Sequence, residues 1–481
     1  MNPSTPMTEW PDDDALLAAL HSWMPDRRWF PLKGDAAPAL SDLSIAADLE
    51  LAPGVRDLLI AASRPAGAPP VLIHVPLVLA PVETLDSFSS PGETPGAWGV
   101  RLPDSDLALV DGAHHPAFWR AWAEAARAAG TVLAGGAEAI AARADSGRVM
   151  TGEQSNTNVV MPRSEGPSDA LDADIVVKLF RVLAAGRNPD VEVSAALAGD
   201  GWDRVRTPVA WSTLEWDDPA TGERALTDSA VACIFIPKAD DGFELFCSFA
   251  KNDDGPAGPV RTRALALAED LGATTAQMHE HMASALGTAD PVPAGELADS
   301  LRTRAHWAMD EVGELEERIP GLRVRVDEVL AELEGVRALE RATRIHGDYH
   351  LGQVLRELDA PFGSAARWFV LDFEGEPLRP LAERSKPDQP MRDLAGMLRS
   401  FDYAAAVGGA KDPKWLACMR TAFIDGYRAT ALPLEGDAVR ARKVLLDALE
   451  LDKALYEAVY EARNRPDWLA IPLHGIAALV G

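Results

Sequence analysis

The sequence predicts a bilobal α+β protein, in which a strand-rich amino-terminal part precedes a mostly helical carboxyl-terminal part. Strand-like segments, separated by Gly- and Pro-rich joints, dominate as far as residue 237. Helical periodicity of the apolar residues dominates from about residue 240 onward. The length of 481 residues is enough for two to four domains around a large core.

The charge balance limits the ligands that the protein can bind. The chain carries 46 basic and 74 acidic residues, for a formal net charge of −28. Such a field repels nucleic-acid phosphates and anionic lipid, so we expect neither partner. A polyanionic small molecule would need local cations or metal ions at its site.

Cysteine use and hydropathy predict a soluble cytoplasmic protein. The three cysteines are Cys233, Cys247 and Cys418, and their spacing fits neither a disulfide framework nor a metal site. The first thirty residues are acidic and lack the pattern of a secretory signal. No apolar run approaches the 18 residues of a membrane span.

Residues 1–96 read as a small α+β unit. A helical pattern over 14–24 ends at Pro25, and a turn-rich joint over 88–97 closes the unit. Three strand-like segments lie between them, at 42–51, 55–64 and 69–82. We find no catalytic chemistry in this unit.

Residues 97–237 form the second predicted domain, in which an Ala-rich helical region over 116–145 precedes a run of strands. The strand candidates are Arg148–Met161, Asp174–Phe180, 203–215 and 227–237. A helix candidate begins near Asp190, between the second and third strands.

Residues 238–481 form the third predicted domain and are mostly helical. The helix candidates are 241–252, 260–288, 296–318, 322–340, 391–407, 414–430 and 436–464. Two short apolar strands, Arg344–His346 and Trp368–Phe373, interrupt the helices.

The residues around these two strands carry the chemistry. Phosphoryl transfer needs a carboxylate that accepts the hydroxyl proton, and oxygen ligands that hold magnesium against the phosphates. The segment IHGDYHLGQVL (345–355) offers Asp348 as the base and Gln353 as a metal ligand. The segment WFVLDFEGEP (368–377) offers Asp372 as the second ligand, with Glu374 assisting. One such Asp alone would be an ordinary loop carboxylate, but the full set in this order indicates a kinase.

The pattern HGDxHxxQ, followed by a strand and DFE, resembles the aminoglycoside-phosphotransferase-like kinases, which are relatives of the protein kinases. The resemblance implies a protein-kinase-like fold with a small β-containing N-lobe and a helical C-lobe, and it implies ATP and Mg²⁺ as cofactors. The family has Asn where this chain has Gln353, which keeps the carbonyl oxygen on a longer arm.

Two long segments, 369–405 and 451–473, more narrowly resemble the maltokinases, which make maltose 1-phosphate from maltose and ATP. This resemblance implies a maltose substrate and trehalose synthase as a partner. The segment WMPDRRWFPLKG (23–34) is similar to text near the start of maltokinases and implies that residues 1–96 are an amino-terminal cap subdomain.

The resemblance also assigns nucleotide-binding residues in the N-lobe. Lys178, on the strand DIVVKLF, matches the lysine that contacts the α- and β-phosphates, and Glu192 opens the next helix and can pair with it. Alone, Lys178 would be an ordinary solvated strand residue. The turn EQSNTNVV (153–160) resembles the maltokinase phosphate loop, although a plain hairpin turn would look the same. Its candidate phosphate contacts are Gln154, Ser155, Asn156 and Thr157.

The acceptor pocket is expected on the last long helix, where aromatic and acidic residues repeat every four positions. The candidate substrate residues are His350, Tyr456, Glu457, Tyr460, Glu461, Asn464, Arg465 and Trp468. An amphipathic helix packed on the lobe is the alternative. Arg392 and Asp393 are expected to support the catalytic loop, and the two histidines of MHEHM (278–282) are read as helix packing, not as a metal site.

Three functions remain open on the sequence. A maltokinase is the first. A glucosamine or aminoglycoside kinase would use the same core with a different pocket, in which Glu457 and Glu461 receive an amine. A catalytically inactive kinase-like binding module should lack part of the machinery, whereas Lys178, Asp348 and the metal ligands are all present.

Overall fold

The protein is described by a computed structural model that forms two compact units. The first unit comprises residues 1–191 and 207–237, and the second comprises residues 192–206 and 238–481. The predicted separation of residues 1–96 from 97–237 stays a prediction. The structure describes residues 9–33, 37–64, 68–87, 97–133, 135–150, 155–163, 170–218, 221–358, 367–376 and 379–481.

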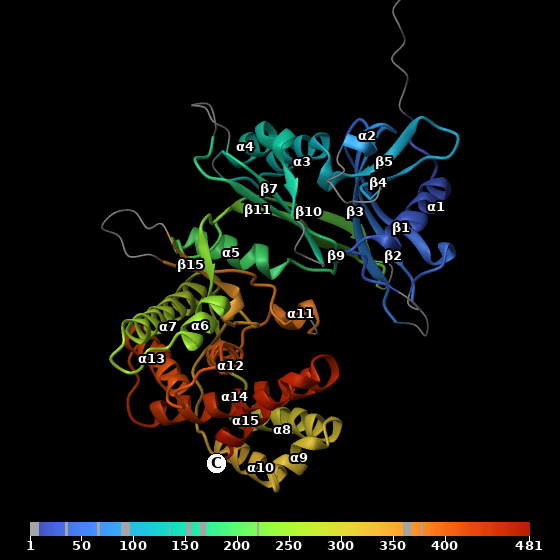
Figure 1. Cartoon of the computed structure of the whole chain (residues 1–481). Helices are drawn as coiled ribbons and strands as arrows, with labels where there is room; N and C mark the ends of the chain where they lie inside the picture. The colour runs from blue at the N-terminus through green and yellow to red at the C-terminus, as the bar shows by residue number, and fades with distance from the viewer. Residues whose placement is uncertain are drawn as a thin grey trace, which may run out of the picture. The chain divides into compact units, whose positions relative to one another are not determined.

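The first unit contains a six-stranded antiparallel sheet, which we call the cap sheet. Its strands follow the order β1-β2-β3-β5-β4, and β9 also pairs with β3 (Figure 1). Helix α1 (Asp13–Trp23) buries Leu16 and Leu20 among the apolar side chains of this sheet. The strands are β1 (Leu43–Ala52), β2 (Val55–Ala62), β3 (Val71–Pro81), β4 (Gly99–Arg101), β5 (Leu107–Asp111) and β9 (Val182–Leu183).

A second, five-stranded antiparallel sheet in the same unit has the order β10-β11-β8-β7-β6. Helices α3 (Pro116–Ala129) and α4 (Gly136–Arg143) bury Trp119, Trp122 and Ile140 against it. The strands are β6 (Arg148–Val149), β7 (Asn156–Met161), β8 (Ile175–Phe180), β10 (Pro208–Asp217) and β11 (Arg224–Ile234).

The two sheets of the first unit share a core. Leu59 and Leu72 of the cap sheet pack with Phe180, Trp216 and Val231 of the five-stranded sheet. Helix α2 (Thr84–Ser87) is a single turn, and α5 (Pro189–Gly199) begins in the first unit and ends in the second.

The second unit is mostly helical, as predicted (Figure 1). Two helices were not predicted from the sequence: α11, which is a single turn, and α15, which follows the expected pocket residues. The helices are α6 (Gly242–Lys251), α7 (Pro259–Leu286), α8 (Ala294–Glu311), α9 (Glu314–Arg318), α10 (Leu322–Glu334), α11 (Leu381–Arg384), α12 (Met391–Gly408), α13 (Trp415–Thr430), α14 (Asp437–Asn464) and α15 (Ala470–Leu479). Among the described helices, none has the length and apolar character needed to cross a membrane.

Two small sheets carry the catalytic sequence motifs. One has the order β12-β15-β16, with β12 at Ala239–Asp241, β15 at Val354–Glu357 and β16 at Trp368–Val370. The other pairs β13 (Thr288–Ala289) with β14 (Ala342–Thr343). The expected strand at Arg344–His346 is wrong, because the backbone N–H of His346 donates to the side chain of Asp393 and not to a neighbouring strand.

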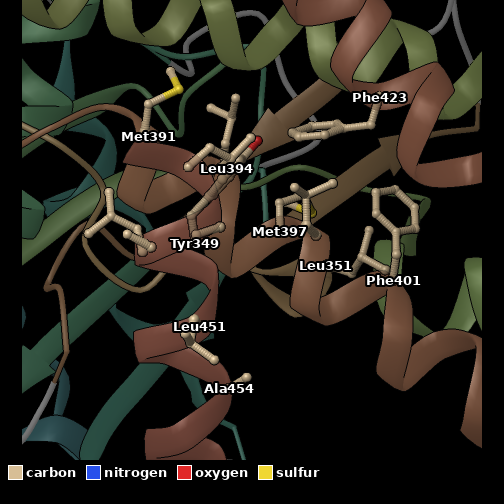
Figure 2. Close-up of a cluster of buried hydrophobic side chains, with 14 of the residues drawn as sticks. Tyr349, Leu351, Met391, Leu394, Met397, Phe401, Phe423, Leu451 and Ala454 are labelled. Atoms are coloured by element: carbon tan, nitrogen blue, oxygen red, sulfur yellow. The ribbon is translucent and has the colours of Figure 1, made fainter. Parts of the chain in front are cut away.

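The catalytic motif is anchored in the core of the second unit. Tyr349 and Leu351 are buried among Met391, Leu394, Met397 and Phe401 of α12, with Phe423, Leu451 and Ala454 nearby (Figure 2). The Tyr349 hydroxyl lies 3.0 Å from the Thr275 hydroxyl of α7, so even the polar end of this side chain is paired. Alternate residues of the motif therefore point into the core, which leaves Asp348 and His350 to face outward.

Helices α7 and α13 approach each other at two glycines. A Cβ on Gly272 would lie 2.0 Å from the carbonyl oxygen of Phe423, and a Cβ on Gly426 would lie 1.9 Å from that of Glu269. Neither position has room for a side chain unless the helices move apart.

We expect Gly426→Ala to lower the free energy of unfolding by about 1–3 kcal/mol, since overpacking outweighs the helix propensity gained. Gly295→Ala on α8 is the matched control, because nothing lies within 4 Å of its Cβ position. The control should gain about 0.5–1 kcal/mol. Urea unfolding of both variants measures the difference, and equal effects would contradict the close packing.

Candidate active site

The catalytic segment turns sharply at Gly347. This residue has φ of +82°, and a Cβ there would lie 3.3 Å from the Cα of Gly375, which itself has φ of +71°. Positive φ and close backbone approach both favour glycine. The turn brings the segment that contains Asp348 against the segment that follows β16.

Asp393 of α12 holds this turn from inside the core. Its carboxylate accepts the N–H groups of His346 at 2.8 Å and Gly347 at 2.9 Å, and it accepts Nε2–H of His279 at 3.0 Å. Burial alone would raise the Asp393 pKa, but the hydrogen bond and charge of His279 and the other donors hold it below the usual value. The prediction that Asp393 supports the catalytic loop is confirmed.

The two expected metal ligands lie side by side. The β15–β16 hairpin pairs Val354 with Val370, and the next backbone bond runs from Leu371 N–H to the Gln353 carbonyl at 2.9 Å. The side-chain amide of Gln353 donates to Asp372 Oδ2 at 3.1 Å. Asp372 has φ of +63°, a strained value for a non-glycine residue that is common at functional sites.

The donor chemistry of this pair fits a magnesium ion. Carboxylate oxygens of Asp372 and Glu374 lie within 4.8 Å of each other. Carboxylate and amide oxygens are the hard ligands that Mg²⁺ takes, usually with several waters and the substrate phosphates. The side-chain oxygen and nitrogen of Gln353 are distinguished only by their hydrogen bonds. If the two are exchanged, the Gln353 oxygen lies beside the Asp372 carboxylate, where both could bind the ion.

Of the two histidines of the MHEHM segment, His279 is buried between helices, as expected, whereas His281 lies at the surface. His279 contacts Asp393 through Nε2 and the Tyr427 hydroxyl, at 3.1 Å, through Nδ1. His281 binds Asp200 at 2.7 Å on the surface. The two rings thus have different partners and share no site.

A cavity of about 750 Å³ opens beside Asp348. It is lined by the catalytic segment, the start of α6, and parts of α12 and α14. The structure places almost all expected substrate residues on its wall. They are His350, Tyr456, Glu457, Tyr460, Glu461, Arg465 and Trp468. Asn464 is not among the lining residues, and its side-chain amide donates to the backbone oxygen of Tyr460.

Lys453 is a site residue that the sequence reading missed. Its Nζ lies 3.5 Å from Asp348 Oδ1 and 3.8 Å from Glu376 Oε1. Burial would lower the Lys453 pKa, but the negative charges of Asp348 and Glu376 raise it above its usual value. Lys453 precedes Tyr456 by three residues and Glu457 by four, which places all three on one face of the helix. This spacing was the signal in the sequence that could have identified Lys453 as a site residue.

His350 also lies close to Asp348. Its Nε2 lies 4.0 Å from Asp348 Oδ2, and its Nδ1 accepts the N–H of Gly352 at 3.1 Å. Burial lowers the pKa of His350, although the charge of Asp348 opposes the change. The lowered pKa favours the neutral form of His350 beside Asp348.

Two carboxylates of α14 face the cavity with basic partners behind them. Glu457 accepts Nε–H of the fully buried Arg399 at 2.9 Å. Burial raises the Glu457 pKa, and Arg399 opposes the rise. Glu461 accepts Arg465 and the Tyr403 hydroxyl, the latter at 2.9 Å.

Aromatic side chains form another wall. The Arg465 guanidinium lies 4.4 Å from the ring centre of Trp468 and 5.3 Å from that of Tyr460. Tyr403 lies 6.0 Å from Trp468, ring centre to ring centre. Such faces suit the C–H side of a sugar ring.

The expected nucleotide residues of the first unit lie on two neighbouring strands. Lys178 of β8 forms an ion pair with Asp190 at 3.0 Å, and Asp190 was not singled out from the sequence. Glu192, for its part, accepts Arg344 at 2.6 Å in the second unit. The pairing of Lys178 with Glu192 stays a prediction.

The expected phosphate contacts at the start of β7 differ in exposure. Ser155 is exposed and Asn156 is half-buried. Thr157 is buried, and its hydroxyl accepts Nε–H of Arg181 at 2.8 Å. Gln154 lies outside the described residues.

Comparison with known proteins agrees with this geometry. Residues 249–432 match the model of the phosphotransferase enzyme family. The chain is similar to phosphotransferases of that family over this segment. The match covers Asp348, Gln353, Asp372 and Asp393, and it ends before α14, which carries much of the cavity wall.

Two similar curated proteins are named glucosamine kinase. The protein of Streptacidiphilus jiangxiensis is 29% identical over 316 residues, which cover 62% of this chain and 67% of that protein. The protein of Mycolicibacterium smegmatis is 29% identical over 352 residues, which cover 69% of this chain and 79% of that protein.

Solved structures share the fold of this phosphotransferase. A glucosamine kinase in crystal form B has a TM-score of 0.64 at 20% identity, covering 98% of this chain and 100% of that one. A glucosamine kinase in complex with glucosamine, ADP and inorganic phosphate has a TM-score of 0.61 at 23% identity. The match covers 91% of this chain and 95% of that one. The predicted bilobal kinase-like fold is confirmed, whereas these relatives are not maltokinases.

We expect Asp393→Asn to lower the free energy of unfolding by about 2–3 kcal/mol, because it leaves buried N–H donors without a full acceptor. The folded pKa of Asp393 lies below its unfolded value, so its stabilisation is present above the unfolded pKa and is lost as the pH falls. The difference between wild type and variant should therefore shrink below about pH 4.

The exposed Asp425 of α13 offers the control for this experiment. Asp425→Asn should change stability by less than about 0.5 kcal/mol at any pH. Chemical unfolding at neutral and acidic pH compares the three proteins. A pH-independent loss in Asp393→Asn would argue against the ionised carboxylate as the acceptor.

Proposed function

We propose that this phosphotransferase is an ATP- and Mg²⁺-dependent kinase whose acceptor is an amino sugar, with glucosamine as the first substrate to test. The observation that carries the proposal is the charge of the cavity beside Asp348. Among the described residues, six carboxylates line it, against the two basic side chains of Lys453 and Arg465. The excess of negative charge suits a sugar that carries a positive amine.

Two of these carboxylates are available for an amine. Asp241 and Glu244 stand at the start of α6, and neither forms an ion pair with a residue that the structure describes. Asp241 uses one oxygen to cap α6 by accepting the Glu244 N–H at 2.9 Å, which leaves the other oxygen for a ligand. The remaining four carboxylates are Asp348, Glu376, Glu457 and Glu461, each of which has a basic partner.

The relatives support the same reading, since the two curated proteins are named glucosamine kinase and one similar structure holds glucosamine and ADP. Maltose is the second candidate. The aromatic wall of Tyr456, Tyr460 and Trp468 and the cavity volume of about 750 Å³ would suit a longer sugar. The expected partner, trehalose synthase, was implied only by the resemblance to maltokinases, so it applies only if maltose is the substrate.

The roles of the chain's own residues follow from the geometry. Asp348 would accept the proton of the attacking hydroxyl, and Lys453 Nζ lies 3.5 Å from its carboxylate. Gln353, Asp372 and Glu374 would hold Mg²⁺, which when bound supplies positive charge to the phosphate oxygens. In the first unit, Lys178 would contact the nucleotide phosphates. An inactive binding module is disfavoured, because none of these residues is missing.

Incubation with ATP, Mg²⁺ and glucosamine, glucose or maltose should give phosphorylated glucosamine as the main product, identified by mass spectrometry. We expect Asp348→Asn to lower kcat for glucosamine by about 10²–10⁴-fold, as for other lost general bases. ADP affinity should stay near the wild-type value, since the base contacts the acceptor. Near-normal turnover of this variant would show that Asp348 is not the base.

Amine recognition is tested separately by Asp241→Asn. Asn keeps the helix cap but loses the negative charge, so KM for glucosamine should rise about tenfold, equivalent to about 1.4 kcal/mol. KM for glucose, which has no amine, should change little. Asp240→Asn is the matched control, because it makes the same change one residue earlier, outside the cavity wall. A rise for both sugars alike, or a preference for maltose, would overturn the amino-sugar proposal.

A further inference from the structure

Arg181 lies where the chain passes from one sheet of the first unit to the other. It follows β8, which carries Lys178, and precedes β9, which pairs with β3 of the cap sheet. The side chain is fully buried. A buried guanidinium is costly unless it is paired, so its contacts indicate what it does.

The side chain joins three segments that are distant in sequence. Nε–H donates to the Thr157 hydroxyl of β7 at 2.8 Å, and NH2 donates to Asp111 Oδ2 of β5 at 2.7 Å. The guanidinium also lies 4.4 Å from the ring centre of Trp29. Burial lowers the Arg181 pKa, while Asp111 opposes that change.

The backbone at the same point is fixed as well. The carbonyl of Arg181 accepts the N–H of His74 at 2.9 Å. The His74 ring, also buried, bonds Phe180 O at 2.8 Å and Asp57 Oδ1 at 2.5 Å. Both ring nitrogens lie within hydrogen-bonding distance of an oxygen, so the ring links β2 and β3 to the end of β8.

This network contacts the strands expected to bind nucleotide. Thr157 is paired with Leu179, the residue after Lys178, and Asn158 is paired with Lys178 itself. Thr157 also directly follows Asn156, one of the expected phosphate contacts. A shift of β7 or β8 against the cap sheet would therefore move the groups expected to meet the phosphates.

We propose that Arg181 is a positioning residue through which the cap sheet sets nucleotide affinity. Asp111 and Trp29 hold the guanidinium, and the guanidinium holds Thr157 and hence the first residues of β7 beside Lys178. Thr157 then acts through its hydroxyl bond to Arg181 and not by touching phosphate. The proposal rests on the proposed use of ATP, and it gives the cap sheet a role in nucleotide binding.

Thr157→Val tests the proposal, because it removes the hydroxyl and keeps the branched shape. We expect ADP binding, measured by calorimetry, to weaken by about 5–10-fold, a typical coupling between sites. KM for ATP should rise by a similar factor, with kcat at saturating ATP changed by less than about twofold. Thr157→Ser keeps the hydroxyl and should restore both values.

Thr227→Val is the matched control, since Thr227 is also buried and lies on β11 of the same sheet. Thr227→Val should leave ADP affinity unchanged. If ADP binding weakens equally in the two valine variants, the cause is a general loss of stability, and the proposal is overturned. If the wild type binds ADP and Thr157→Val binds it equally well, the positioning role of Arg181 is overturned and the proposed function is not. A wild-type protein that binds no ADP would overturn the proposed function together with it.

Discussion

The geometry of the catalytic segment depends on the buried carboxylate of Asp393. It takes the backbone N–H groups of His346 and Gly347, which would otherwise pair with a neighbouring strand or lie buried without an acceptor. The chain consequently leaves its extended course after Thr343 and turns at Gly347. Asp348 follows this turn, and its position at the cavity is a consequence of the turn and of the buried Tyr349 beyond it.

A second constraint is the charge that an acidic chain collects around its site. Half-buried carboxylates are costly unless a cation or several donors compensate them. Arg399 compensates Glu457, and Arg465 compensates Glu461, so these side chains are oriented before any ligand arrives. Lys453 compensates the charge of Asp348. Among the described residues of the cavity wall, the carboxylates without an ion pair are Asp241 and Glu244 at the start of α6, which makes that end of the cavity the more negative.

The sequence allowed prediction of the long helices of the second unit to within about six residues, because their apolar stripes repeat with helical period over long segments. Short strands were less predictable. Val354–Glu357 forms β15 in a segment for which no helix or strand was predicted, since four residues carry too little periodicity to show. Arg344–His346 has the composition of a strand, but a side chain of α12, distant in sequence, takes one of its N–H groups. Long-range hydrogen bonds of this kind leave no local signal.

For the site, the sequence by itself determined which chemistry the chain carries, because the order and spacing of Asp348, Gln353 and Asp372 reflect the needs of phosphoryl transfer. It also placed the expected acceptor residues on α14, whose helical period puts them on neighbouring faces. Only the tertiary structure decided which of the described charges in the cavity are paired and that Lys453 lies beside Asp348. Pairing is a property of distances between segments far apart in the chain, and the sequence alone does not specify those distances.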